Sequence, residues 1–476
     1  MTIPKQQRVI RPMQAEINHQ LNLYNYTLAK LSELTKIRRT YLTGFMRGQA
    51  CWVLRVDQLN AIGQAFEKPV GWLYELYADE YFRGERISKK QLKAYLIKCA
   101  EIDRQDCIQM VIPRLLKNLQ FIDVFFTIAE ELFYRGRQKE SIFFYQLVID
   151  NELFKHKERF SMSHYRLFQM SETTNIELIW KAVILFEPYR KGLSEHRQLD
   201  ALLRLGKYYR TLHSWEEVGK YAEELIQLAE LVYKGELFMK KRGKNVDAGF
   251  SDSQLIAYYG QGSLLKAISL EKQGLYEQAK KFLADCTNLK RFELLDESGK
   301  LEADKFGKLI LSNICRLDIL MGNTNILSDY VEFLEDNSTE ILPGFITIVE
   351  SANKYGLSID TILDKFSREI HFFDNYRDSV NVDRHQQFRY QLAIYHLKNK
   401  RPNDGLKEIL KCMTLSTILN SRKELIRCIR LFEEYRYLVS FQQEREYKRI
   451  LEEVMTDESL KGRSHPLSEE RPIVKH

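Results

Sequence analysis

Apolar residues recur along most of the chain at intervals of three and four residues, which is the spacing of one helix face. Met13, Ile17 and Leu21 form the first such stripe, and from about Ser88 onward nearly the whole chain follows the same amphipathic pattern. The 476 residues include only 9 prolines and 22 glycines, which favours helices joined by short turns. The pattern therefore predicts an all-α protein.

The segment LSELTKIRRTYLTGFMRG predicts two short helices joined by a tight turn. Thr27 stands at the N-cap position ahead of the first of them. Thr35-Lys36 makes the turn, and Ile37 is the apolar residue that fills it. The second helix runs from about Arg38 to Met46 and ends at Gly48 as a left-handed C-cap. The positions expected to face inward are Leu28, Leu31, Leu34, Leu42 and Phe45.

Two further helices complete the first eighty residues. One starts at Val56 or Asp57 and carries the inward run Leu59, Ile62 and Phe66. The other starts at Pro69, a residue suited to the first turn of a helix. We therefore expect a small five-helix domain over residues 1–80.

Positive charge is concentrated in this domain. The whole chain has a formal net charge of +7, and ten basic residues face five acidic ones through residue 78. No acidic residue occurs between Leu34 and Val56. Such an acid-free basic stretch favours a polyanion as the partner of this end of the protein.

The five-helix pattern resembles the repressor-type helix-turn-helix domain of phage and plasmid regulators over residues 12 to 78. The matches are Leu31, Ile37, Arg39, Thr40, Leu42, Arg47 and Gly48, followed by the run LNAIGQAF. The resemblance implies that the third helix enters the DNA major groove by its N-terminus. The alternative is that this segment is a helical hairpin whose basic face is solvated and does not bind DNA. The expected DNA contacts are Thr27, Lys36, Arg38, Arg39, Thr40, Tyr41, Thr43 and Arg47.

Residues 81–455 contain irregularly spaced copies of the tetratricopeptide (TPR) pattern, which has small residues on two helices and a turn residue between them. We expect a right-handed TPR-like α-solenoid of about seven to nine helix pairs, with an irregular α-bundle as the alternative. Residues 240–253 read as a surface loop and 456–476 as a polar tail. The turn residues of the five copies are Gly136, His213, Gly274, Gly322 and Lys400.

Motifs that carry chemistry are missing from the sequence. There is no P-loop, HExxH or nucleophile elbow, and the seven cysteines lack zinc-ligand spacing. We therefore expect no catalytic residue, no metal, no cofactor and no enzymatic activity. No run approaches the roughly 18 to 20 apolar residues that span a bilayer, so we expect a cytoplasmic protein that does not enter a membrane.

A repressor-type domain followed by degenerate TPR repeats resembles the RRNPP group of peptide-sensing regulators of Gram-positive bacteria, their plasmids and their phages. The resemblance implies a homodimer that binds a double-stranded DNA operator under the control of a short signalling peptide in the concave groove. The alternatives are a regulator whose repeats bind a protein partner such as an anti-repressor, and a non-enzymatic scaffold. The expected peptide-binding residues are Lys207, Arg210, Gln261, Asn313, Arg316, Gln387 and Tyr390.

Overall fold

The structure, a computed structural model, describes residues 12–48, 53–82, 87–153, 158–171, 175–242, 251–286, 292 and 295–463, with side chains described to residue 454. Regular structure in these ranges is helical throughout and comprises 24 α-helices with short 3₁₀ turns. The predicted all-α class is therefore confirmed for the described residues. The chain divides into two compact units, residues 1–170 and 171–476.

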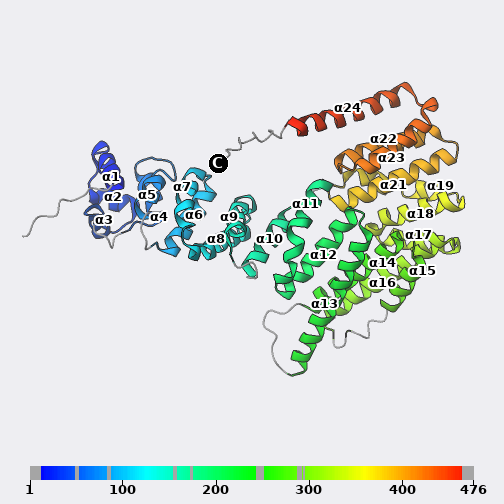
Figure 1. Ribbon diagram of the computed structural model, residues 1–476, viewed down its shortest axis with the longest axis horizontal. Coiled ribbons are helices and arrows are strands. Elements are labelled where there is room, and N and C mark those ends of the chain that lie inside the picture. Colours follow the sequence, from blue (N-terminus) through cyan, green and yellow to red (C-terminus); the bar gives the residue numbers. More distant parts are fainter. Residues whose placement is uncertain are drawn as a thin grey trace, which may run out of the picture. The chain divides into compact units, whose positions relative to one another are not determined.

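The described residues of unit 1 form ten α-helices, drawn in blue to green in Figure 1. The first five are α1 (Pro12–Leu23), α2 (Leu28–Thr35), α3 (Arg39–Met46), α4 (Val56–Ala65) and α5 (Tyr74–Tyr81). The others are α6 (Lys89–Glu101), α7 (Gln105–Leu115), α8 (Ile122–Tyr134), α9 (Gln138–Asn151) and α10 (Glu158–Met170).

One hydrophobic core runs through unit 1 from Met13 to Val148. Tyr95 of α6 joins the first five helices to the later ones, because its hydroxyl donates to the Tyr74 carbonyl at 3.0 Å and the two rings lie 5.4 Å apart. The division predicted between residues 80 and 81 therefore lies inside a unit with a shared core.

Most inward positions predicted for α1 to α4 are buried, as the apolar stripe of α1 shows. Two details of the prediction were wrong. Leu34 is 44% exposed, and Thr35 is buried in its place because its hydroxyl donates to the Leu31 carbonyl within α2. Helix α5 begins at Tyr74 and not at Pro69, because residues 70–73 form turns.

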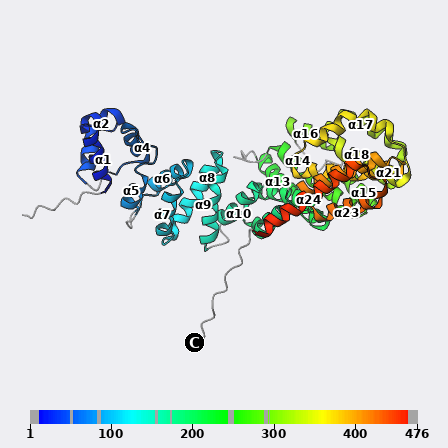
Figure 2. The same ribbon diagram turned by 90° about the horizontal axis from the view of Figure 1, so that it is seen from above.

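Unit 2 is built from successive helices that pack on their neighbours (Figure 2). Its first helices are α11 (Ile176–Phe186), α12 (Glu195–Thr211), α13 (Trp215–Lys241), α14 (Asp252–Lys272), α15 (Tyr276–Cys286) and α16 (Glu297–Met321). They are followed by α17 (Leu327–Asp336), α18 (Ile341–Tyr355), α19 (Asp360–Lys365), α20 (Ser367–Phe372), α21 (Ser379–Lys398), α22 (Pro402–Ile418), α23 (Arg422–Glu434) and α24 (Phe441–Arg463).

The helices of unit 2 follow a repeat-like order. Helices α12, α14, α16, α18 and α21 pack one against the next, while α13, α15, α17 and the short pair α19 and α20 lie between them in the chain. This order resembles stacked helix pairs and is consistent with TPR-like repeats. Of the predicted loop 240–253, residues 243–250 lie outside the described residues, as do the side chains of the predicted tail.

All five predicted turn residues have a left-handed backbone. Their φ angles are 77° at Gly136, 55° at His213, 78° at Gly274, 104° at Gly322 and 59° at Lys400. The left-handed region is the usual conformation at the end of a helix that closes into a tight turn. The turn positions read from the repeat pattern are therefore confirmed, and two of them adopt this conformation without being glycine.

Candidate functional site

The turn between α2 and α3 is held in place on both sides. Thr27 caps α2, because its hydroxyl oxygen accepts from the Lys30 backbone N–H at 3.2 Å. Lys36 ends the helix with a φ of 55°, and Ile37 is only 5% exposed. The Ser32 hydroxyl donates to the Ile37 carbonyl at 2.6 Å and joins the turn back to α2. The start of α3 is therefore fixed by local contacts.

Helix α3 buries one side and exposes the rest. Leu42 and Phe45 are each 1% exposed, whereas Arg39 and Thr40 at its start are exposed. The side-chain amide of Gln14 in α1 donates to the Phe45 carbonyl at 2.6 Å and anchors the C-terminal end of the helix. The N-terminal end, where the helix dipole is positive, faces solvent with basic side chains around it.

Four basic residues of this surface have no partner among the described residues. Their side chains make no hydrogen bond or ion pair there, whereas neighbouring Lys30 and Arg55 are paired with Glu33 at 3.1 Å and Asp57 at 2.9 Å. Unpaired cations beside a positive helix end suit an anionic partner such as a phosphate backbone. We call these four residues the α3 basic face: Lys36, Arg38, Arg39 and Arg47.

Two predicted DNA contacts are more enclosed than expected. Tyr41 is half-buried, and its hydroxyl donates to the Val53 carbonyl. Thr43 is also half-buried and donates to the Arg39 carbonyl at 2.8 Å. Both side chains therefore take part in holding α3 in place, in contrast to the outward position predicted for them.

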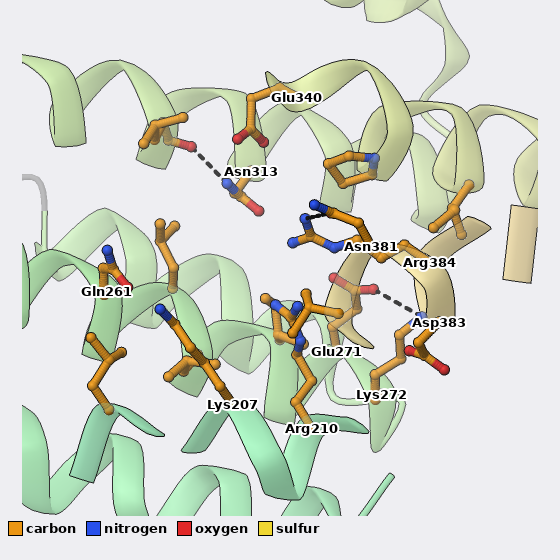
Figure 3. Close-up of a pocket in the computed structure, with 18 of the residues that line it drawn as sticks. Lys207, Arg210, Gln261, Glu271, Lys272, Asn313, Glu340, Asn381, Asp383 and Arg384 are labelled. Atoms are coloured by element: carbon orange, nitrogen blue, oxygen red, sulfur yellow. Dashed lines mark hydrogen bonds and ion pairs between the residues drawn. The ribbon is translucent and has the colours of Figure 1, made fainter. Parts of the chain in front are cut away.

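A pocket of about 1010 Å³ lies within unit 2 (Figure 3). Most of its wall comes from α12, α14, α16, the start of α18 and α21, which are the helices of one layer of the repeat-like order, and α13 and α17 add one residue each. Its volume is at the upper end of the range of about 300–1,000 Å³ that is common for ligand pockets. The pocket is therefore large enough for an extended ligand.

The pocket gathers most of the predicted peptide-binding residues. Although these residues are spread over 181 positions of the sequence, the repeat-like order brings their helices together. Tyr390 does not line the pocket, because its ring packs against Arg427 of α23, whose guanidinium lies 4.4 Å from the ring centre. The six predicted residues that do line it are Lys207, Arg210, Gln261, Asn313, Arg316 and Gln387.

Arg316 and Asn313 belong to a buried network in the wall. Arg316 forms an ion pair with Glu271 and donates to the Asn313 side-chain oxygen at 3.1 Å. Burial opposes the charge of Arg316, but the neighbouring Glu271 carboxylate raises its pKa above the usual value. Burial likewise opposes the charge of Glu271, and Arg316 lowers its pKa. The charge of Arg316 is therefore matched inside the protein.

Three partly buried cations of the pocket lack a carboxylate partner among the described residues, as does the exposed Arg377 at its edge. The side chains of Lys207 and Arg210 make no hydrogen bond or ion pair with any described residue, and Arg384 donates only to the Asn381 side chain at 3.3 Å. Burial, with Arg384 nearby, lowers the pKa of Arg210 to about 9. Burial also lowers the pKa of Lys207, with Arg210 as the next cause. These charges are held in the pocket without an ion pair to another described residue.

Most acidic residues of the pocket are already engaged. Asp383 contacts His213 at 3.0 Å and accepts from Gln387 at 2.8 Å, and Asp200 accepts from Arg204 at 3.1 Å. Asp378 caps α21. Glu340 makes no hydrogen bond or ion pair with another described side chain. The free charges of the pocket are therefore mainly positive.

The sequence prediction missed many of the polar residues that line the pocket. Arg384 lies three residues before the predicted Gln387 and so shares its face of α21, which the helical period alone could have shown. Asn381 lies one turn further back. The missed residues include Glu271, Glu340, Asn381 and Arg384.

Comparisons with known proteins identify no family for this chain. No family model matches it, and no curated protein matches it. Among solved structures the chain is similar to a circular tandem repeat protein with novel repeat topology and enhanced subunit contact surfaces. The identity is 12% over 94% of this chain and 91% of that chain, and the TM-score of 0.13 is too low to support any argument.

Within the described ranges, no group of three or more His, Cys, Asp or Glu side chains is arranged to hold a metal ion. Over the same ranges, every helix is too short or too polar to cross a bilayer.

Proposed function

We propose that this protein is a DNA-binding transcriptional regulator of the RRNPP type, in which a short peptide in the unit 2 pocket controls operator binding. The observation that carries the proposal is the presence in one chain of an unpaired basic helix face and a pocket lined by six of the seven residues expected to bind a peptide. Each feature fits one half of a ligand-controlled DNA-binding protein.

The α3 basic face supports the DNA-binding half. Arg38 and Arg39 stand at the exposed start of α3, where a helix that enters the major groove presents its side chains to base edges. Arginine at such a position pairs with guanine through two hydrogen bonds or holds a phosphate. Lys36 and Arg47, which flank the two ends of α3, suit contacts with phosphate. Thr40 is exposed between them.

The pocket supports the control half. His213, at the end of α12, contacts Asp383 of α21, which is 170 positions away in the sequence. This bond joins two of the helices that enclose the pocket, so a bound ligand and the curvature of the helix layer affect each other. A ligand shifts such an array only by its different affinity for two arrangements. In a homodimer, two arrangements present the two α3 helices at different spacings, and an operator matches one of them.

Replacement of Arg38 and Arg39 by alanine tests the DNA-binding half. The expected loss of affinity for the DNA upstream of the protein's own gene is at least about 30-fold, if each arginine contributes about 1–3 kcal/mol. The slope of log affinity against log salt concentration also becomes shallower by about 1.8. Fluorescence anisotropy with a labelled duplex measures both quantities.

The matched control is Lys89→Ala with Lys90→Ala, which removes the same charge from an exposed position at the start of α6. This control is expected to bind DNA as the wild type does. Equal loss in the two double variants, or no loss in either, contradicts the assignment of α3. A peptide that binds in the pocket but changes neither the dimer geometry nor the affinity for the operator contradicts the proposed regulation by peptide.

A further inference from the structure

The wall formed by α12 and α21 holds the unpaired charges of the pocket. Lys207 and Arg210 are three positions apart on α12, so they project from the same face of that helix. Arg384 projects from α21, and Figure 3 shows the three side chains reaching into the cavity from these two helices. Three cations from two helices thus lie around one part of the pocket.

Without a ligand, this arrangement of like charges lowers the stability of the folded protein. Charged groups taken out of water need a partner, and like charges near one another oppose each other further. No nearby acid among the described residues forms an ion pair with these cations. Asp383 is engaged by His213 and Gln387, and Glu340 favours the charge of Arg384 without bonding to it. Burial lowers the pKa of both guanidinium groups, with Arg384 as a further cause at Arg210 and Arg316 as a further cause at Arg384. An anion from outside the chain offsets this cost.

The remainder of the lining restricts the anion. Five acidic residues also face the pocket, which disfavours a ligand with several negative charges. Apolar side chains of α14 lie beside the cations, namely Leu264, Leu265 and Ile268. The amide of Gln261, which makes no side-chain hydrogen bond with a described residue, adds a polar contact. The lining therefore suits a ligand with one singly charged group and an apolar remainder.

We infer that Lys207, Arg210 and Arg384 form a subsite for a single carboxylate of the ligand, with apolar side chains of the ligand lying along α14. Arginine binds carboxylate through two parallel hydrogen bonds, which gives both affinity and orientation. As regards the peptide nature of the ligand, this inference rests on the proposed function. The carboxylate comes either from the C-terminus of the peptide or from an acidic side chain.

Peptide mixtures with defined ends test the inference. Three hexapeptide mixtures are offered to the full-length protein: free C-terminal acids without Asp or Glu, the same peptides amidated, and amidated peptides that contain Asp or Glu. Native mass spectrometry measures which members are retained. We expect at least tenfold greater retention of one carboxylate-bearing mixture than of the amidated acid-free one. The first mixture identifies a C-terminal carboxylate, and the third identifies an acidic side chain.

Variants connect the retention to the subsite. Arg210→Gln and Arg384→Gln each lower retention at least tenfold. Arg368→Gln, which removes the same charge from an exposed position outside the pocket, leaves retention unchanged. Equal retention of amidated acid-free peptides, or retention that is the same in Arg210→Gln as in the wild type, overturns the subsite but leaves peptide control intact.

A small carboxylate separates the subsite from the proposed function. N-acetylleucine carries one carboxylate and one apolar side chain, and N-acetylleucine amide lacks the charge. The acid is expected to raise the unfolding temperature of the wild type but not of Arg210→Gln, and the amide to raise neither. This result without retention of any peptide supports the subsite and overturns peptide control. No difference between acid and amide, together with no peptide selectivity, overturns the subsite.

Discussion

The two units use unpaired arginines in different surroundings. On α3 of unit 1, Arg38 and Arg39 are exposed, so water and salt screen their charges at little cost. In the pocket of unit 2, Arg210 and Arg384 are enclosed by protein, and burial lowers the pKa of each. The same side chain therefore has a different effect on folding in each place. On α3 it is available for a partner without affecting the fold, whereas in the pocket the absence of a partner lowers stability.

Arg316 lies in the same pocket but has surroundings of a third kind. It is enclosed like Arg210, but it has Glu271 as an ion-pair partner and Asn313 as a hydrogen-bond partner. The ion pair distinguishes Arg316, whose charge is balanced within the folded chain, from Arg210, whose charge has no ion-pair partner among the described residues. Substitutions at the three kinds of position should therefore affect stability to very different extents.

The largest effect is expected when the buried pair is broken. Glu271→Gln leaves the Arg316 guanidinium uncompensated, which should lower the free energy of unfolding by about 3–5 kcal/mol. Denaturation in urea, followed by circular dichroism, measures the change. Glu302→Gln removes a carboxylate from the more exposed pair with Lys305, which is 3.3 Å long, and should cost less than about 1 kcal/mol.

The dependence on pH gives this prediction a second test. The pKa of Glu271 is lower in the folded protein than in the unfolded chain, so its contribution is fully present above its ordinary pKa. That contribution is lost as the pH falls through the folded value. The difference in stability between wild type and Glu271→Gln should therefore shrink on acidification. A difference that is the same at pH 7 and at pH 3 contradicts the pairing.

The order of the helices and the turns could be predicted from the sequence, because both depend on local patterns. Gly274 and Gly322 mark helix ends by their own conformational preference, and the spacing of small residues placed His213 and Lys400 at equivalent turns. The turns at Asp103 and Asn420 have the same left-handed backbone but carried no recognisable repeat pattern around them. Degenerate repeats retain geometry longer than they retain residue types.

Which cations of the pocket form ion pairs could not be predicted, because pairing depends on contacts between distant segments. Groove-facing positions were read from the helical period, and the period makes no distinction between Arg210 and Arg316. Only the position of Glu271, 45 residues before Arg316, decides which of the two is paired. Tyr390 was placed in the pocket by the same period, but the Arg427 guanidinium of α23 lies over its ring.

A smaller effect of opposite sign is expected for the unpaired charge. Arg210→Gln removes a cation whose charged form is disfavoured in the folded state. Without ligand, the variant should therefore be more stable than the wild type. Solvent in the pocket screens the charge, so the expected gain in the free energy of unfolding is only about 1 kcal/mol. Thermal unfolding at pH 7.5, with Arg368→Gln as the control, measures the gain. A loss of stability contradicts the unpaired state of Arg210.

The gain should also depend on pH. Because burial lowers the folded pKa of Arg210 to about 9, well below its value in the unfolded chain, the unfolded chain binds more protons above about pH 9. Stability of the wild type therefore rises with pH in this window as far as Arg210 is concerned. The advantage of Arg210→Gln should be smaller at pH 10 than at pH 7.5, and an advantage that grows with pH contradicts the assignment.

The smallest effect is expected on α3. The double variant Arg38→Ala with Arg39→Ala should change the free energy of unfolding by no more than about 0.5 kcal/mol, because both side chains are exposed and unpaired among the described residues. Urea denaturation of this variant beside Lys89→Ala with Lys90→Ala measures the change. A loss above about 1 kcal/mol shows that the arginines hold α3 in place, and the loss of DNA binding then has a structural cause. An unchanged stability together with lost DNA binding assigns the two charges to the partner and leaves the pocket as the place where charge and folding are coupled.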